Sequence, residues 1–266
     1  MSAALQKAIA AACLEKETRW ESDLAGFLAA HGVDDADARA LLEGPRRLGL
    51  YRKLVRHNVV NVASNMLERT KARMEAIAPG AFAETIDAFL AERGPQTHHL
   101  RDVPEELLRW AAPRWEADAR LPRWLVDYAE LELVDFTIGV APRPAPPPPL
   151  AEVAADLPLV FREPTRLVRL SWAVQGLGDD ATPDERPVAL FVYRDAEHRS
   201  RFLELTPLAA AILVRLLEGR PLAPAVAEAC AAEGWTVDAE ILGGAAALLA
   251  DLGERGVLLG ARGETR

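Results

Sequence analysis

The segment that most restricts the fold of this chain is residues 141–150, in which six of the ten residues are proline. Proline has no backbone N–H and a fixed φ angle, so such a segment forms neither a helix interior nor a central strand. It favours the extended polyproline II conformation and acts as a semi-rigid spacer. The sequence therefore predicts two domains, residues 1–140 and 151–266, joined by a proline-rich linker at 141–150.

The first domain has the apolar periodicity of helices throughout. Asp34 and Asp37 stand where helix starts are favoured, and the longest pattern continues until Pro79-Gly80 ends it. An all-helical domain is expected. Its helices are predicted at 3–14, 20–31, 45–78, 81–93, 105–116 and 122–136.

The second domain begins with apolar runs that alternate with polar residues, as strands do. Thr206 and Pro207 then form a helix start, with Thr as the N-cap and Pro at the first helical position. The predicted order is β-β-β-α-α-α, the content of a winged-helix-like domain, and the whole chain is predicted to be α+β. The strands are expected at 167–174, 187–194 and 199–205, the helices at 207–218, 222–233 and 238–252, and a short closing strand at 257–259.

The net charge of −9 argues against a general binder of nucleic acid or of anionic membranes. Both halves share this acidity, with net charges of −4 before residue 141 and −5 from it onward. One stretch is different, because eight bases and one acid lie between Arg46 and Arg73. That stretch is compatible with a solvated helix face, a docking surface for an acidic protein, or contact with DNA phosphates.

The predicted helices of the second domain test the DNA interpretation. A DNA-reading helix should present bases or amides to the groove. The helices at 222–233 and 238–252 contain no Lys or Arg, and they carry acids that would repel phosphate: Glu228, Glu233, Asp238, Glu240 and Asp251. Nucleic acid is therefore not an expected partner.

Patterns for catalysis and metal binding are absent from the sequence. There is no phosphate-binding glycine loop, no CxxC and no HExxH, so no catalytic residue, metal ligand or cofactor is expected in this chain. Cys13 and Cys230 both stand in alanine-rich helical contexts, which favours buried thiols in a reducing cytoplasm. No window has the ~18–20 apolar residues that a membrane span needs.

Residues 45–137 resemble the HvfC/BufC family, whose N-terminal domain is named for DNA binding. The family pattern Tyr-Arg-x-x-Val-x-x-Asn is met by Tyr51, Arg52, Val55 and Asn58. The pattern Trp-Leu-x-Asp-Tyr-Ala-x-Leu-Glu is met by Trp124, Leu125, Asp127, Tyr128, Ala129, Leu131 and Glu132. The family's Phe-Pro-x-Thr is here Leu67-Glu68-Arg69-Thr70, without the proline, so the chain is a divergent member by this comparison.

Residues 205–259, together with the three strands before them, resemble PqqD-like domains, which bind the leaders of ribosomally synthesised precursor peptides. An exposed strand edge beside an apolar helix suits such binding, because a peptide can add to the sheet as an extra strand. The predicted peptide-binding residues are Phe202, Leu203 and Leu205 on the third strand and Leu248 and Leu252 on the last helix.

The two resemblances together imply an accessory subunit without catalytic activity. Its partners would be a TIM-barrel multinuclear non-haem iron oxidase, which would hold the iron, and a ribosomally synthesised precursor peptide. The predicted enzyme-docking residues are Tyr51, Arg52, Arg56 and Asn58. The alternative hypotheses are a DNA-binding transcriptional regulator, which would rest on the 46–73 bases, and a stand-alone enzyme, for which the sequence offers no site.

Overall fold

The computed structural model describes all residues except 1, 16–18, 143, 179–180 and 264–266. The chain is a mixture of helix and sheet and divides into two compact units, Met1–Ala129 and Glu130–Arg266. The division falls inside helix α9 (Leu125–Val140), before the proline-rich segment. Hydrogen bonds explain this position. The Ser200 hydroxyl donates to the carbonyl of Asp135 at 2.9 Å, and Arg194 donates to the carbonyl of Ala141 at 2.5 Å.

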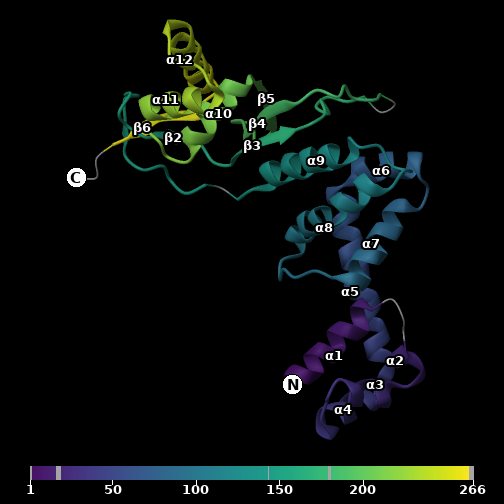
Figure 1. Ribbon diagram of the computed structural model, residues 1–266. Helices are drawn as coiled ribbons and strands as arrows, with labels where there is room; N and C mark the ends of the chain where they lie inside the picture. Colours follow the sequence, from purple (N-terminus) through teal and green to yellow (C-terminus); the bar gives the residue numbers. More distant parts are fainter. Residues whose placement is uncertain (1, 16–18, 143, 179–180, 264–266) are drawn as a thin grey trace. The chain divides into compact units, whose positions relative to one another are not determined.

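The first unit is helical, as predicted (Figure 1). Asp34 caps its helix by accepting a hydrogen bond from the Asp37 N–H at 2.8 Å, which confirms that helix start. The helices are α1 (Ala3–Leu14), α2 (Arg19–Ser22), α3 (Leu24–Ala30), α4 (Asp35–Leu42), α5 (Pro45–Met66), α6 (Glu68–Ile77), α7 (Ala81–Glu92), the 3₁₀ turn η1 (Leu100–Asp102) and α8 (Val103–Ala117), followed by the start of α9.

The prediction of one continuous helix over 45–78 is wrong, because the chain breaks at Leu67. Leu67 has φ −122° and ψ 39°, outside the helical region, and its side chain is fully buried. The break lets α5 and α6 bury Met66 and Met74 separately. Apolar periodicity alone does not reveal it, because the periodic pattern resumes directly after the break.

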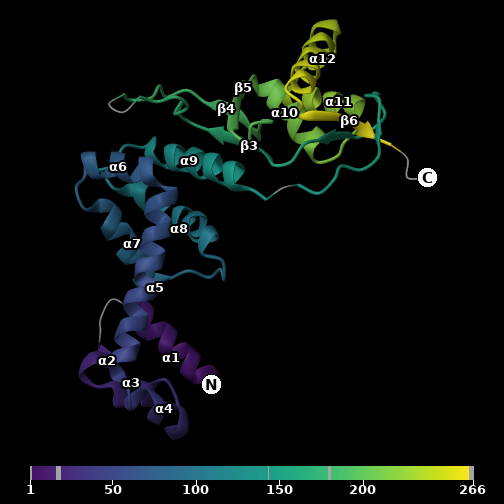
Figure 2. The same ribbon diagram turned by 180° about the vertical axis from the view of Figure 1, so that it is seen from behind.

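The second unit contains two antiparallel three-stranded sheets (Figure 2). The sheet in the order β3 (Thr165–Leu170), β4 (Val188–Arg194) and β5 (Ser200–Leu205) matches the three predicted strands, although β3 ends before Ser171. The other sheet has the order β1 (Leu150–Ala151), β6 (Leu258–Arg262) and β2 (Leu159–Phe161). The closing strand is therefore confirmed as β6, whereas β1 and β2 were not predicted.

Three helices follow β5 at the predicted places: α10 (Pro207–Leu217), α11 (Leu222–Glu233) and α12 (Ala239–Glu254). Thr206 accepts a hydrogen bond from the Ala209 N–H at 3.2 Å, so the predicted N-cap is confirmed. One face of the β3-β4-β5 sheet packs on α10 and α12 through a core that includes Phe191, Leu213 and Leu252. No helix in the described part of the chain is long and apolar enough to cross a bilayer.

Candidate functional site

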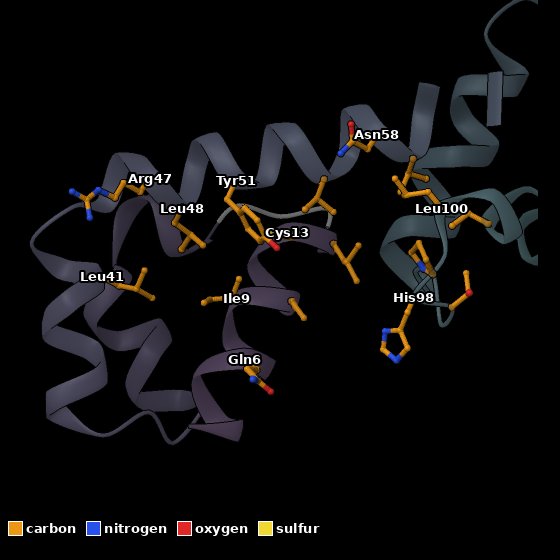
Figure 3. A pocket seen from close by; sticks show the side chains of 17 residues that line it. Gln6, Ile9, Cys13, Leu41, Arg47, Leu48, Tyr51, Asn58, His98 and Leu100 are labelled. Atoms are coloured by element: carbon orange, nitrogen blue, oxygen red, sulfur yellow. The ribbon is translucent and has the colours of Figure 1, made fainter. Parts of the chain in front are cut away.

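A groove runs along α5 in the first unit, between this helix, α1 and residues 95–103 (Figure 3). Its volume is about 800 Å³. Leu41 and Arg47 lie at one end, and His98 and Leu100 lie at the other. Most of its lining is apolar, which is the usual composition of a binding site.

Two of the four predicted docking residues, Tyr51 and Asn58, line this groove. The Tyr51 side chain is 52% exposed. The two residues are seven positions apart, about two helical turns, so they lie on one face of α5. Sequence reasoning missed the opposite wall, which α1 supplies through Ile9 and Cys13. The apolar face of α1 was visible in the sequence, but its position opposite α5 was not.

The other two predicted docking residues, Arg52 and Arg56, are half-buried and bind within the unit. Arg52 donates to the carbonyl of Ala12 at 2.6 Å, and Arg56 donates to the carbonyl of Leu14 at 3.5 Å. Arg56 also forms an ion pair with Asp87. Helix C-termini have carbonyls without intrahelical partners, so these arginines fasten the last turn of α1 to α5. Burial and the nearby Arg56 charge lower the pKa of Arg52.

The basic stretch over 46–73 is therefore not one continuous surface. Besides Arg52 and Arg56, Arg73 lies over the rings of Trp124 and Tyr128, at 5.7 Å from each centroid. Stacking on aromatic rings stabilises a guanidinium group inside the unit. The resemblance motif at Trp124 thus has a packing role, since Trp124 and Leu125 are buried.

Four of the five predicted peptide-binding residues come together in the second unit. Leu205 and Leu252 are buried in its core, and Leu203 and Leu248 are partly buried against that core. Phe202 lies on the opposite face of β5, because side chains alternate along a strand, and it is 40% exposed. Leu205 and Leu252 therefore support the fold, and the residues that reach the surface are Phe202, Leu203 and Leu248.

The exposed face of β5 is polar next to Phe202. Glu204 accepts hydrogen bonds from Arg186 at 2.5 Å and from Gln175 at 2.9 Å. The hydrogen bond from Arg186 holds the pKa of the Glu204 carboxyl below its usual range. Glu204 is therefore ionised at neutral pH, and a single charge-paired carboxylate is no candidate for acid–base chemistry.

Metal-ligating residues are scattered over the described part of the chain. No group of three His, Cys, Asp or Glu side chains comes together there. Cys13 and Cys230 are both buried free thiols, and burial raises the pKa of Cys13. The Cys13 thiol therefore lacks the lowered pKa expected of a nucleophile.

A segment of the second unit matches a known family. Residues 164–253 match the HvfC C-terminal domain, a segment that begins just before β3 and ends in the last turn of α12. The match supports an HvfC-like family and suggests an accessory subunit of a multi-component system. It covers about a third of the chain, and it falls on the half compared above with PqqD-like domains. No curated protein matches the chain.

Proposed function

We propose that this chain is an accessory subunit without catalytic activity, which works in the cytoplasm on two partners. It binds a multinuclear non-haem iron oxidase and recognises the leader of a ribosomally synthesised precursor peptide. In this proposal the oxidase holds the iron and performs the oxidation, and the chain brings the peptide to it. Support for an accessory role comes from the HvfC-like segment at 164–253.

The observation that carries the proposal is the free edge of β5. In the order β3-β4-β5, β5 pairs with β4 on one side and, within the described residues, with no strand on the other. The backbone N–H of Asp195 donates to the carbonyl of Arg199 at 2.9 Å, which fixes the register of the hairpin. Hydrogen-bonded pairs alternate along an antiparallel ladder, so the backbone groups of Phe202 and Glu204 point outward.

A peptide added at this edge would form backbone hydrogen bonds with Phe202 and Glu204. Its side chains would alternate between the two faces of the β3-β4-β5 sheet. On the α12 side they would reach Leu203 and Leu248, which are partly buried apolar side chains. We interpret β3–β5 with α10–α12 as a winged-helix, PqqD-like module on this basis.

Two substitutions of Phe202 separate the contribution of its backbone N–H to peptide binding from that of its ring. Phe202→Pro removes the outward N–H but leaves the β4–β5 ladder, since proline is tolerated in edge strands. Phe202→Ala keeps the N–H and removes the ring. With the fluorescein-labelled leader of a candidate precursor peptide, we expect Phe202→Pro to raise Kd about tenfold or more and Phe202→Ala to raise it about threefold or less. Equal affinities of the wild type and Phe202→Pro would contradict strand addition.

The partner is tested by co-expression with a candidate multinuclear iron oxidase. We expect a complex that survives size-exclusion chromatography, with iron found in the oxidase. Failure of the two proteins to co-purify counts against the proposal, and so does stoichiometric iron in the single chain.

The alternative function, DNA-binding regulation, has less support from the geometry. Arg52, Arg56 and Arg73 use their guanidinium groups within the first unit. A mobility-shift assay at physiological salt distinguishes the two functions, because phosphate contacts weaken steeply as salt rises. Specific, salt-sensitive binding of duplex DNA would overturn the peptide-recognition proposal.

A further inference from the structure

The groove in the first unit is long and apolar. Its lining on α5 extends from Arg47 to Val59, about 18 Å at 1.5 Å per residue. Leu48 and Val55 are apolar side chains of that wall, and Ile9 and Cys13 face it from α1. A third helix fits between two helices in this way when it presents apolar side chains on one face.

Apolar side chains also extend beyond the groove onto its rim. Tyr51 and Leu100, which line it, are 52% and 50% exposed. Leu54 is 50% exposed, and it lies between Tyr51 and Asn58 on the helix surface because residues three and four positions apart are neighbours. A small molecule would be enclosed by the groove and would leave this rim in water. A helix lying along the groove would cover both, which favours a protein partner.

The charge of the groove is positive although the chain as a whole is acidic. Arg47 and His98 are its titratable basic groups, one at each end, and no carboxylate is among its lining residues. Arg47 is exposed and forms no ion pair with any described residue. Opposite charges across an interface fix the orientation of a partner, so an acidic side chain is expected beside Arg47.

From these three features we propose that the α1–α5 groove binds an amphipathic helix of about three turns from a protein partner, with an acidic residue beside Arg47. The inference rests on the proposed function in one respect, since an accessory role supplies a protein partner. Leucines or similar side chains spaced i, i+4 and i+7 would occupy the apolar floor formed by Leu48, Val55 and Ile9.

A direct test uses synthetic helices of about 14 residues, stapled to hold the helix, with leucines on one face. One peptide carries glutamates beside the leucines and the other carries lysines. By fluorescence anisotropy with the full chain, we expect the glutamate peptide to bind about tenfold more tightly than the lysine peptide. Equal binding of both peptides, or binding of neither, would overturn the proposal.

Three variants test whether the peptide binds in the groove. Val55→Arg puts a charge on the apolar floor and should raise Kd about tenfold or more. Arg47→Glu should reverse the order of the two peptides. Lys53→Glu is the matched control, because Lys53 is an exposed base of the same helix that does not line the groove, and its Kd should stay within about twofold.

Folding and a competing ligand are controlled separately. Circular dichroism reports whether Val55→Arg keeps its helices, and the Arg47→Glu reversal tests the site without altering the floor. Dodecanoate is the small-molecule probe. Saturable binding of dodecanoate that Val55→Arg abolishes, without binding of either peptide, would overturn the proposal and show that the groove binds a fatty acid.

The test with the oxidase separates the two proposals. A Val55→Arg chain that still co-purifies with the oxidase, as the wild type does, would overturn the groove as the docking site and leave the accessory function standing. If the wild-type chain binds the glutamate peptide but no oxidase, the proposal of an oxidase partner is overturned and the proposal that the groove binds a helix stands.

Discussion

Helix α5 and strand β5 were both predicted to present side chains to a partner, but their apolar side chains differ in solvent exposure. On α5, Leu50, Tyr51 and Leu54 are 60%, 52% and 50% exposed. On β5, Leu205 is 8% exposed, and its neighbour Leu252 on α12 is fully buried. Where α5 offers side chains to a partner, β5 offers mainly its backbone edge.

The difference follows from what covers each element. One face of β5 is packed under α10 and α12, so its apolar residues have become core. The outer side of α5 has no such cover among the described residues, and its leucines stay in water. An exposed apolar patch on a helix indicates a binding surface, whereas an apolar run in a strand is accounted for by the fold itself.

The largest effect is expected from truncating the core beneath β5. Leu252→Ala should lower the free energy of unfolding by about 2–5 kcal/mol, because a fully buried leucine leaves a cavity. Leu54→Ala on α5 should change it by less than about 0.5 kcal/mol. Urea denaturation of both variants measures this, and similar losses for the two would break the comparison.

The next effect concerns the backbone of the β1-β6-β2 sheet. Gly260 has φ +146°, and a Cβ there would lie 2.8 Å from the carbonyl oxygen of Ala151 on β1. Gly260→Ala should therefore cost about 1–3 kcal/mol. Gly243→Ala in α12 is the control with the opposite sign, since a Cβ there meets open space and alanine favours a helix by up to about 1 kcal/mol. Thermal melts of the two variants should shift in opposite directions.

A smaller effect separates the arginines of α5. Arg52→Gln removes the hydrogen bond to the Ala12 carbonyl and should cost about 1–2 kcal/mol. Arg47→Gln removes an exposed positive charge. It should change the free energy of unfolding by less than about 0.5 kcal/mol and should weaken binding of the glutamate peptide. If Arg47→Gln destabilised the chain as much as Arg52→Gln, the division between structural and docking arginines would be wrong.

The smallest effect is a pH dependence of the β4–β5 hairpin. Asp195 accepts hydrogen bonds from the Arg199 N–H at 2.8 Å and from Arg201 at 2.6 Å, and the first of these lowers the pKa of Asp195 most. A lowered native pKa adds stability above the unfolded pKa of about 3.9, and this stability is lost as pH falls through the native value.

The melting temperature of the wild type should therefore fall more than that of Asp195→Asn as the pH drops from about 6 to about 3. Parallel pH profiles of the two proteins would show that the ionised carboxylate does not hold the hairpin. The α5 groove has no carboxylate in its lining and provides the contrasting site.

Much of the fold was predictable because the signals are local. The Asp34 and Thr206 caps, the strands around the Asp195 hairpin and the helices after Pro207 all follow from neighbouring residues. The break at Leu67 and strands β1 and β2 were not predictable. The break interrupts a continuous periodicity, and the two short strands exist through pairing with β6, more than 90 residues away.

The sequence by itself determined that the N-terminal region is helical and that three strands, β3 to β5, are followed by three helices, α10 to α12. Only the tertiary structure decided which of the predicted peptide-binding residues reach the surface, and that Arg52 and Arg56 hold α1 while Tyr51 and Asn58 line a groove. The physical reason is that periodicity gives the face on which a side chain lies. Whether that face is buried depends on elements distant in the chain.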